Sequence, residues 1–365
     1  MRRRGWMALL MTLSLVLTGC WDQESFTNRA SALIMEVSPT NRPGEYLWNF
    51  IFPNTTVTVS SLSSLPPREQ LYAVAVEAPS LAKAFVRVQQ KLARDLYLGQ
   101  LEVVIWANTM PVARVRRLVA SLNRQGQIPK SFWVLLGRPP LVPLVEVTPQ
   151  EAIPSIYITR YFDCQQCQPA FLGRYFWQVW ANFVTPGISP VVPVASTRTR
   201  IDRIAVYGDH GPPTIWTRPE TLGWAYLTGR VSKEAVHLGT PWGYVDVGQM
   251  RGETFTQIRR LPHSVGVSSL VVVHGILASW PSGVPLTQPR LNQLRRLVER
   301  SVWQDCEAAI SEANRTHTDP FGYARTLFWQ EMGISPLAYS PAFTHLPIQA
   351  HIAVRVDLRD VGVGG

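Results

Sequence analysis

The N-terminal segment of the chain indicates in which cellular compartment the rest of the chain folds. A basic start, Arg2 to Arg4, precedes a short apolar run over residues 6–17. This order is typical of a secretory signal peptide. About a dozen apolar residues are too few to cross a hydrocarbon core of ~30 Å as a helix. We therefore expect residues 1–19 to be a signal peptide and the rest of the chain to fold outside the cytoplasm.

A cysteine directly follows the apolar run. Leu17, Thr18 and Gly19 stand before Cys20, and small residues in front of a cysteine are typical of a bacterial lipoprotein cleavage site. We predict that signal peptidase recognises these three residues and that the Cys20 thiol carries a diacylglyceryl group, because a thiolate is the best nucleophile at that position. The alternative is an ordinary signal peptide followed by a cysteine without a role. Lipidation would anchor the protein to the bacterial cell membrane.

The composition predicts a folded, basic protein. The chain has 46% hydrophobic and 16% charged residues, which supports a sizeable core and argues against global disorder. The net charge is +10, and removal of three arginines with the signal peptide leaves +7. A basic balance favours an anionic partner, and for a lipid-anchored protein anionic headgroups are the nearest candidate. No nucleic-acid partner is expected, because no basic run is interleaved with a known binding motif.

The other cysteines suggest structural roles. Cys164 and Cys167 form a C-x-x-C pair, for which a local disulfide is possible outside the cytosol. A zinc site is the alternative, and it is disfavoured because no second pair or histidine cluster lies nearby. Cys306 falls on the apolar side of a helical pattern and is expected to be a buried thiol. No other segment is hydrophobic enough to span a membrane.

The N-terminal half predicts a hairpin followed by a helix. Residues 30–37 and 46–52 read as two strands joined by a turn. Residues 53–70 are rich in Ser, Thr and Pro and read as a linker. A helix is expected to begin after Ser80 as its N-cap, and its apolar residues recur at helical spacing as far as Leu96.

A buried strand and a second helix are expected next. Residues 101–107 are nearly all apolar, as in a strand covered on both faces. Asn108 or Thr109 is expected to cap the following helix, with Pro111 in its first turn. Residues 132–136 read as the next strand. This order of elements indicates an α/β arrangement.

The composition shifts to Pro, Val, Ser and Thr over residues 186–200, and we place a domain boundary there. The N-terminal α/β domain is expected to span residues 20–193. The C-terminal α/β region is expected to span residues 198–365, with a further division near 245–265. The expected fold class is α+β or mixed α/β, a multi-domain chain of mixed sheets packed with helices.

The C-terminal region predicts long elements. Residues 244–278 read as strands, and residues 348–358 alternate apolar and polar like a strand with one buried face. Gly229 and Gly239 are expected at turns that need positive φ. Thr287 is expected to cap the longest helix, whose apolar stripe is Leu291, Leu294, Val298, Val302, Cys306 and Ile310.

Two aromatic segments and two groups of arginines are candidate surfaces. Aromatic residues gather over 157–183, where core packing is the usual role and a partner surface is the alternative. Residues 224–226 are a second candidate contact surface, and core packing is again the alternative. The arginines over 114–124 and 290–300 can face anionic lipid or an acidic partner, and the alternative is a solvated helix face.

The sequence contains no recognisable catalytic or metal-binding motif. The signatures of nucleophile elbows, P-loops, zinc proteases, EF-hands and dinucleotide-binding turns do not occur. Seven histidines are scattered, and no two are four residues apart. We therefore expect no catalytic residue, no metal and no cofactor, and a protein that is not an enzyme.

Five stretches, in order along the chain, resemble the lipoprotein C subunits of spore germinant receptors, the Ger(x)C family. They are GCWDQE at 19–24, KLARDLYLGQLEVVIWA at 91–107, PQEAIP at 149–154, ETLGWAYLTGR at 220–230 and DPFGY at 319–323. The chain departs from the family at residues 32–36, where a GIGID-like stretch is usual, and at Pro320 and Tyr323.

This resemblance implies a function and partners. Proteins of this family are lipoproteins on the outer face of the inner spore membrane. They work with membrane-embedded A and B subunits in the response to nutrients that starts spore germination. The resemblance also implies a multi-domain α/β fold of mixed sheets.

Two alternatives from other classes stay open. A solute-binding lipoprotein of a transporter would need two α/β lobes with repeated crossovers, and the order of elements suggests these in the N-terminal half alone. An envelope hydrolase would need a Ser or Cys within hydrogen-bond reach of a histidine in a cleft.

The lipid anchor can be tested at Cys20. A Cys20→Ala variant is expected to leave the membrane fraction, because stable anchoring needs two or three acyl chains at ~0.8 kcal/mol per buried CH₂. Fractionation after a high-salt wash measures this. A variant that stays with the membrane would contradict the anchor.

Overall fold

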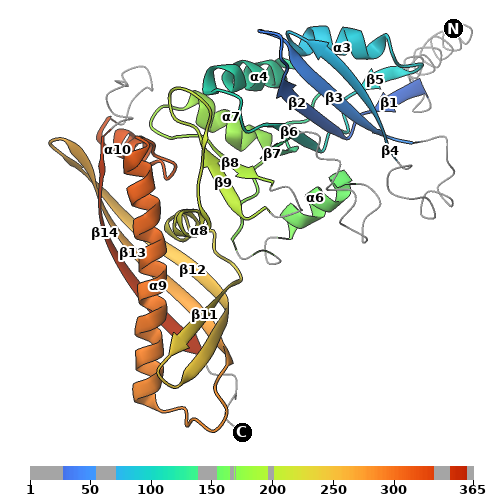
Figure 1. The fold of residues 1–365 in the computed structure, drawn as a ribbon. Coiled ribbons are helices and arrows are strands. Elements are labelled where there is room, and N and C mark those ends of the chain that lie inside the picture. The colour runs from blue at the N-terminus through green and yellow to red at the C-terminus, as the bar shows by residue number, and fades with distance from the viewer. Residues whose placement is uncertain are drawn as a thin grey trace, which may run out of the picture.

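The computed structural model of the chain describes residues 28–54, 71–138, 154–164, 168, 170–195, 201–332 and 346–359. Two main sheets with helices packed on them build the protein, as the expected fold class of mixed sheets requires (Figure 1). Cys20 and the three residues before it lie outside the described residues, as does most of the expected linker over 53–70.

Among the described residues, eight strands form the N-terminal sheet, in the order β10-β9-β8-β7-β6-β2-β3-β4. The expected hairpin is confirmed, because β2 and β3 pair antiparallel from Ile34 opposite Ile51 to Pro39 opposite Tyr46. β6 runs parallel to both β2 and β7. The strands are β2 (Ile34–Pro39), β3 (Tyr46–Pro53), β4 (Leu71–Ala78), β6 (Val103–Ala107), β7 (Trp133–Gly137), β8 (Val191–Val194), β9 (Arg203–Val206) and β10 (Thr214–Ile215).

The central strands β6 and β7 are buried at every residue, as the apolar run over 101–107 predicts. Their side chains alternate between two cores: Val104 and Trp106 pack on one face, and Val103 and Ile105 pack on the other. Helices α3 (Leu81–Gln89), α4 (Val112–Arg124) and α7 (Phe176–Val184) cover the first face. Helix α6 (Pro154–Asp163) covers the second (Figure 1).

Two expected helix boundaries are wrong. Helix α3 ends at Gln89 and not near Leu96, because the Gln89 side chain hydrogen-bonds to the backbone of the following turn. The chain then forms β5 (Asp95–Tyr97), which pairs with β1 (Arg29–Ser31) in a separate sheet. Helix α4 has Pro111 and not Asn108 or Thr109 as its N-cap. The carbonyl oxygen of Gly211, distant in sequence, accepts from the Val112 N–H at 2.7 Å.

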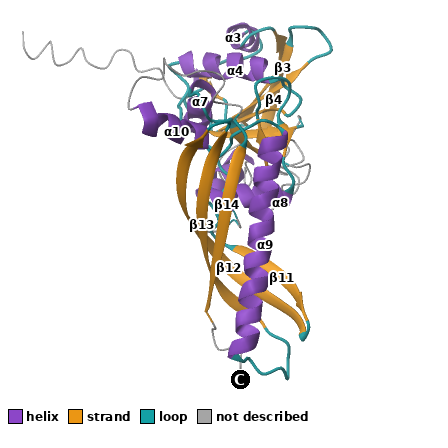
Figure 2. Ribbon diagram, turned by 90° about the vertical axis from the view of Figure 1, so that its left-hand side faces the viewer, coloured by secondary structure: helices purple, strands orange, loops and turns teal. Residues whose placement is uncertain are grey.

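The C-terminal region is built on a long hairpin. β12 (Gly243–Leu261) and β13 (Ser264–Ser279) pair antiparallel, β11 (Glu234–Thr240) flanks β12, and β14 (Ile348–Arg359) pairs parallel with β13. The long helix α9 (Gln288–Arg315) runs along this sheet (Figures 1 and 2). The expected apolar stripe of α9 packs inward, with Leu291 only partly buried, and Ile348, Ile352 and Val356 supply the buried face of β14.

Helix α8 (Arg218–Leu227) crosses α9 at a glycine. Gly223 lies so close to α9 that a Cβ there would stand 1.9 Å from the carbonyl oxygen of Asp305. The neighbouring Trp224 and Tyr226 are fully buried, so the expectation that residues 224–226 form a contact surface is wrong. Gly229 has the expected positive φ of 66°, whereas Gly239 lies within β11 and not at a turn.

A buried aspartate organises the start of α10 (Tyr323–Met332) next to the N-terminal sheet. Asp319 accepts hydrogen bonds from three backbone N–H groups, those of Phe321 (3.1 Å), Gly322 (2.8 Å) and Ala324 (2.7 Å). Its own backbone exchanges hydrogen bonds with Ser189, which follows α7. Burial raises the pKa of Asp319, and the backbone N–H groups act in the opposite direction. This turn therefore joins the two parts of the chain.

The division of the chain at 193–198 stays a prediction. β9 and β10 follow that position, yet β9 pairs antiparallel with β8 and completes the N-terminal sheet together with β10. β12 runs without interruption across most of the second expected division, near 245–265.

The close approach of α8 and α9 predicts a large effect for Gly223→Ala. Overpacking costs ~1–3 kcal/mol in typical cores, and here the obstacle is backbone, which cannot rotate aside. We expect a loss of unfolding free energy at or above the upper end of that range, measured by urea denaturation. The matched control is Gly126→Ala, because a Cβ there meets nothing within 4 Å. Equal midpoints for the two variants would contradict the close crossing.

Candidate functional site

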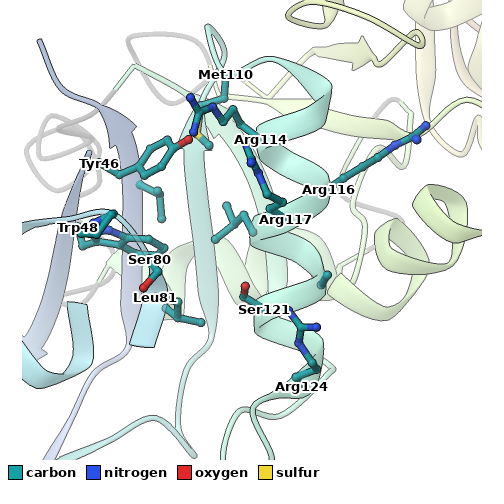
Figure 3. Close-up of a pocket in the computed structure, with 14 residues that line it drawn as sticks. Tyr46, Trp48, Ser80, Leu81, Met110, Arg114, Arg116, Arg117, Ser121 and Arg124 are labelled. Atoms are coloured by element: carbon teal, nitrogen blue, oxygen red, sulfur yellow. The ribbon is translucent and has the colours of Figure 1, made fainter. Parts of the chain in front are cut away.

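A groove lined by arginines lies between α4, the start of α3 and the hairpin β2–β3. Its volume is about 400 Å³. Four of its lining residues are arginines of one helix, Arg114, Arg116, Arg117 and Arg124, and none of its lining residues is acidic. In Figure 3, Arg114, Arg117 and Arg124 lie along α4 opposite Tyr46, Trp48 and Ser80, whereas Arg116 extends away from them.

The aromatic wall of the groove comes from β3. Trp48 is buried, and its Nε1 donates a hydrogen bond to the carbonyl oxygen of Ala78 at 2.9 Å. Tyr46 lies two residues earlier on the same face of the strand, with ring centroids 6.3 Å apart. The Ser80 Oγ accepts from the Lys83 N–H at 3.3 Å and so caps α3, as expected. The wall is therefore held by strand pairing and by a helix cap.

The helical period of α4 places its arginines outside the core. Val112, Val115, Leu118, Val119 and Leu122 are buried against the sheet, so the residues between them face outward. The guanidinium of Arg114 lies 5.7 Å from the centroid of the Tyr46 ring, which gives a cation–π contact. At the other end of α4, the Lys130 Nζ donates to the carbonyl oxygens of Leu122 and Gln125 (2.7 and 2.9 Å).

The groove arginines lack acidic partners. None of the four forms an ion pair with any residue that the structure describes. The nearby Glu45 and Glu77 are engaged with Arg42 and Arg87. Guanidinium groups bind carboxylates and phosphates through two parallel hydrogen bonds. The groove can therefore bind an anionic group beside an aromatic wall.

The structure accounts for the expected cysteines in part. Cys164 is disulfide-bonded and lies next to the end of α6, but its expected partner Cys167 lies outside the described residues, so this pairing stays a prediction. Cys306 is a free, fully buried thiol on α9, as expected, and burial raises its pKa. Within the described ranges, no group of three or more His, Cys, Asp or Glu residues is placed to hold a metal.

The aromatic segment over 157–183 is mostly core, as its composition predicts. Trp133 of β7 stacks on Tyr175 with centroids 3.8 Å apart and also contacts Phe162 of α6 at 4.8 Å. Phe176 is fully buried, whereas Trp177 is 51% exposed on α7. Only this outer side of α7 fits the alternative of a partner surface.

A second polar site lies between α8, β11 and α9. Glu234 is buried, and its Oε1 accepts from the Arg218 Nη2 at 3.1 Å, while its Oε2 has no hydrogen-bond partner among the described residues. Glu234, Arg218 and Asp305 share a cavity of about 190 Å³. Burial, and then the charge of Glu234, raise the pKa of Asp305 to about 7. Sequence analysis missed this site because its three residues are 16 and 71 positions apart.

Residues 22–197 match the family described as the spore germination protein N-terminal domain. This segment belongs to the spore germination protein N-terminal domain family. The whole arginine groove lies within the matched segment of this germination protein.

A crystal structure of the GerBC protein aligns with a TM-score of 0.49 at 11% sequence identity, over 88% of this chain and 96% of that chain. No curated protein matches. Among the described residues, no helix is both long and apolar enough to cross a membrane.

The raised pKa of Asp305 predicts a pH-dependent stability. An Asp carboxyl in the unfolded chain titrates at pH ~4, whereas Asp305 in the folded chain titrates at about 7. Between these two pH values only the folded state keeps this carboxyl protonated. The unfolding free energy therefore falls as pH rises through this range. We expect Asp305→Asn to remove this slope and to be more stable than the wild type at pH 8. Urea denaturation between pH 4 and pH 8 measures it, with Asp95→Asn on the exposed strand β5 as the control. If the unfolding free energy of Asp305→Asn depends on pH as steeply as that of the wild type, the slope does not come from Asp305.

Proposed function

We propose that this protein is the lipid-anchored C subunit of a nutrient germinant receptor and acts by contact, without turnover. Its anchor is the lipid on Cys20, at the outer face of the inner spore membrane. Its partners are the membrane-embedded A and B subunits. The family match and the cleavage site before Cys20 support this proposal.

The arginine groove is the contact site that the geometry favours. Arg114, Arg117 and Arg124 of α4 line it without an ion-pair partner among the described residues, while Arg116 extends away from it (Figure 3). Its concave shape and its aromatic wall suit an acidic peptide segment with an apolar side chain. A flat lipid surface would instead bind exposed charge wherever it occurs, including the arginines of α9. The proposed occupant is therefore an acidic segment of a membrane subunit.

The alternative of a solute-binding lipoprotein has less support. Such a protein would show two α/β lobes with parallel crossovers. In the described residues the N-terminal sheet has parallel central strands, but the C-terminal sheet is an antiparallel hairpin with one parallel edge strand. The large groove is open and lined by cations, whereas solute pockets bury most of a small ligand.

Charge reversal in the groove tests the proposal. For the double variant Arg117→Glu/Arg124→Glu, we expect the amount of membrane subunits that co-purifies to fall at least tenfold. The two new glutamates would repel an acidic segment that the arginines attract in the wild type. The lipid anchor and the fold should be unchanged, as judged by membrane fractionation and by thermal unfolding.

The matched control reverses charges on another helix. Arg296→Glu/Arg300→Glu alters two exposed residues of α9 by the same charge, and we expect full co-purification. Binding of the Cys20→Ala protein to anionic vesicles tests the alternative that the arginines contact lipid and not a protein segment. If both double variants lose vesicle binding equally while the subunits still co-purify, the groove is not the protein contact.

A further inference from the structure

Two arginines, Arg174 and Arg230, lie against the Trp224 ring where the two parts of the chain join, and the charge of a third, Arg325, acts on Arg174. Arg174 precedes α7, Arg230 follows α8, and Arg325 lies in α10. The charges of Arg230 and Arg325 both act on Arg174. None of the three forms an ion pair with a residue that the structure describes.

Arg174 carries the least compensated charge. Its guanidinium lies 5.2 Å from the centroid of the Trp224 ring, and its Nε is buried without a hydrogen-bond partner among the described residues. Burial, and then the positive charges of the other two arginines, lower the pKa of Arg174 to about 9. A guanidinium still keeps its proton at neutral pH. Arg174 is therefore a half-buried positive charge whose Nε is shielded from solvent.

Arg230 is directed at the same aromatic ring. Its guanidinium lies 5.5 Å from the Trp224 centroid and 5.8 Å from that of Phe171. Its Nη1 donates to the carbonyl oxygen of Phe171 at 3.3 Å. Burial lowers the pKa of Arg230 as well. Two guanidinium groups thus share one indole.

The backbone holds the three residues in place. The Arg174 carbonyl oxygen accepts from the Val134 N–H of β7 at 3.1 Å, and the Arg230 carbonyl oxygen accepts from the Phe171 N–H at 2.8 Å. The Arg325 N–H donates to the carbonyl oxygen of Gly187 at 2.9 Å. These contacts fix the backbone from which the three side chains extend.

Contact with Trp224 compensates these charges only in part. Cation–π attraction favours a guanidinium on an indole face. Two guanidinium groups on one ring repel each other, however, and a buried charge is stable when it is paired and hydrogen-bonded. Between them the groups have unused donors, and the Arg174 Nε is one of these. The missing component is an acceptor that carries negative charge.

We propose that Arg174, Arg230 and Arg325 bind an oxyanion, a phosphate or a carboxylate, at the junction of the two parts of the chain. Each guanidinium can donate two parallel hydrogen bonds to such a group. A bound anion would connect the segment before α7 with α8 and α10. This site is separate from the groove on α4 and does not depend on the proposed contact function.

Anion-dependent thermal stability tests this site in the detergent-solubilised full chain. Sodium phosphate, sodium acetate and glycerol 3-phosphate are titrated against sodium chloride at equal ionic strength. We expect at least one oxyanion to raise the unfolding midpoint progressively, while chloride does not, because a ligand that binds the native state alone stabilises it. A larger effect of glycerol 3-phosphate than of phosphate would indicate a headgroup, and a larger effect of acetate a carboxylate.

Two variants test whether these arginines bind an anion or have a structural role alone. Arg174→Gln is expected to abolish the oxyanion effect, and in oxyanion-free buffer to unfold at the same or a higher temperature, since an uncompensated charge is removed. Arg296→Gln removes an exposed arginine of α9 outside both arginine sites and is expected to keep the effect in full. Isothermal titration of the wild type with sodium phosphate, which needs no variant to fold, should show saturable binding with at least one site per chain. Oxyanion effects no larger than that of chloride, or an effect that survives in Arg174→Gln, would overturn the proposal.

Discussion

The burial of Trp224 is the interaction on which the arrangement of the two sheets depends. Its indole Nε1 donates to the carbonyl oxygen of Pro320 at 3.2 Å, immediately before the turn that starts α10. Two arginines from different segments lie against its ring. The residue before it, Gly223, permits α8 to touch the backbone of α9. One helical turn therefore connects the long helix, the start of α10 and the segment that leads into α7.

The protein places arginine side chains in two different environments. On α4 the arginines stand on an open groove, where water compensates them and a partner can replace that water at small cost. At the junction, Arg174 and Arg230 are enclosed, and water can reach them less well. The same residue type thus serves an accessible contact surface in one place and an interior site in another. The difference lies in solvation, which follows from the packing of the elements around each guanidinium.

Local periodicity predicted the regular elements well where one face is buried. The stripe of α9, the alternation in β14 and the apolar run of β6 each correspond to a buried face in the structure, because side-chain period and burial are directly coupled. Prediction failed where a distant partner set the boundary. Helix α3 stops at Gln89 since the following residues pair with β1, and α4 starts at Val112 since Gly211 accepts its first N–H.

The candidate site was predicted in part. The arginines of α4 were expected on an outward face, because helical spacing alone separates them from the buried stripe. That they line a groove with Tyr46 and Trp48 requires β3 to lie beside α4, and no local pattern contains this. Residues 224–226 were wrongly expected at the surface, because a short aromatic stretch looks the same in a core and at an interface.

By itself, the sequence determined the period of each long element and the resemblance to the receptor subunits, and it predicted an export signal and a cysteine that would carry a lipid. These are properties of neighbouring residues, and neighbours in sequence are always neighbours in space. Only the tertiary structure decided which charges lie together. Arg174, Arg230 and Arg325 are far apart along the chain, as are Arg218, Glu234 and Asp305. Their electrostatics depend on distance and desolvation, and both arise when the sheets and helices pack.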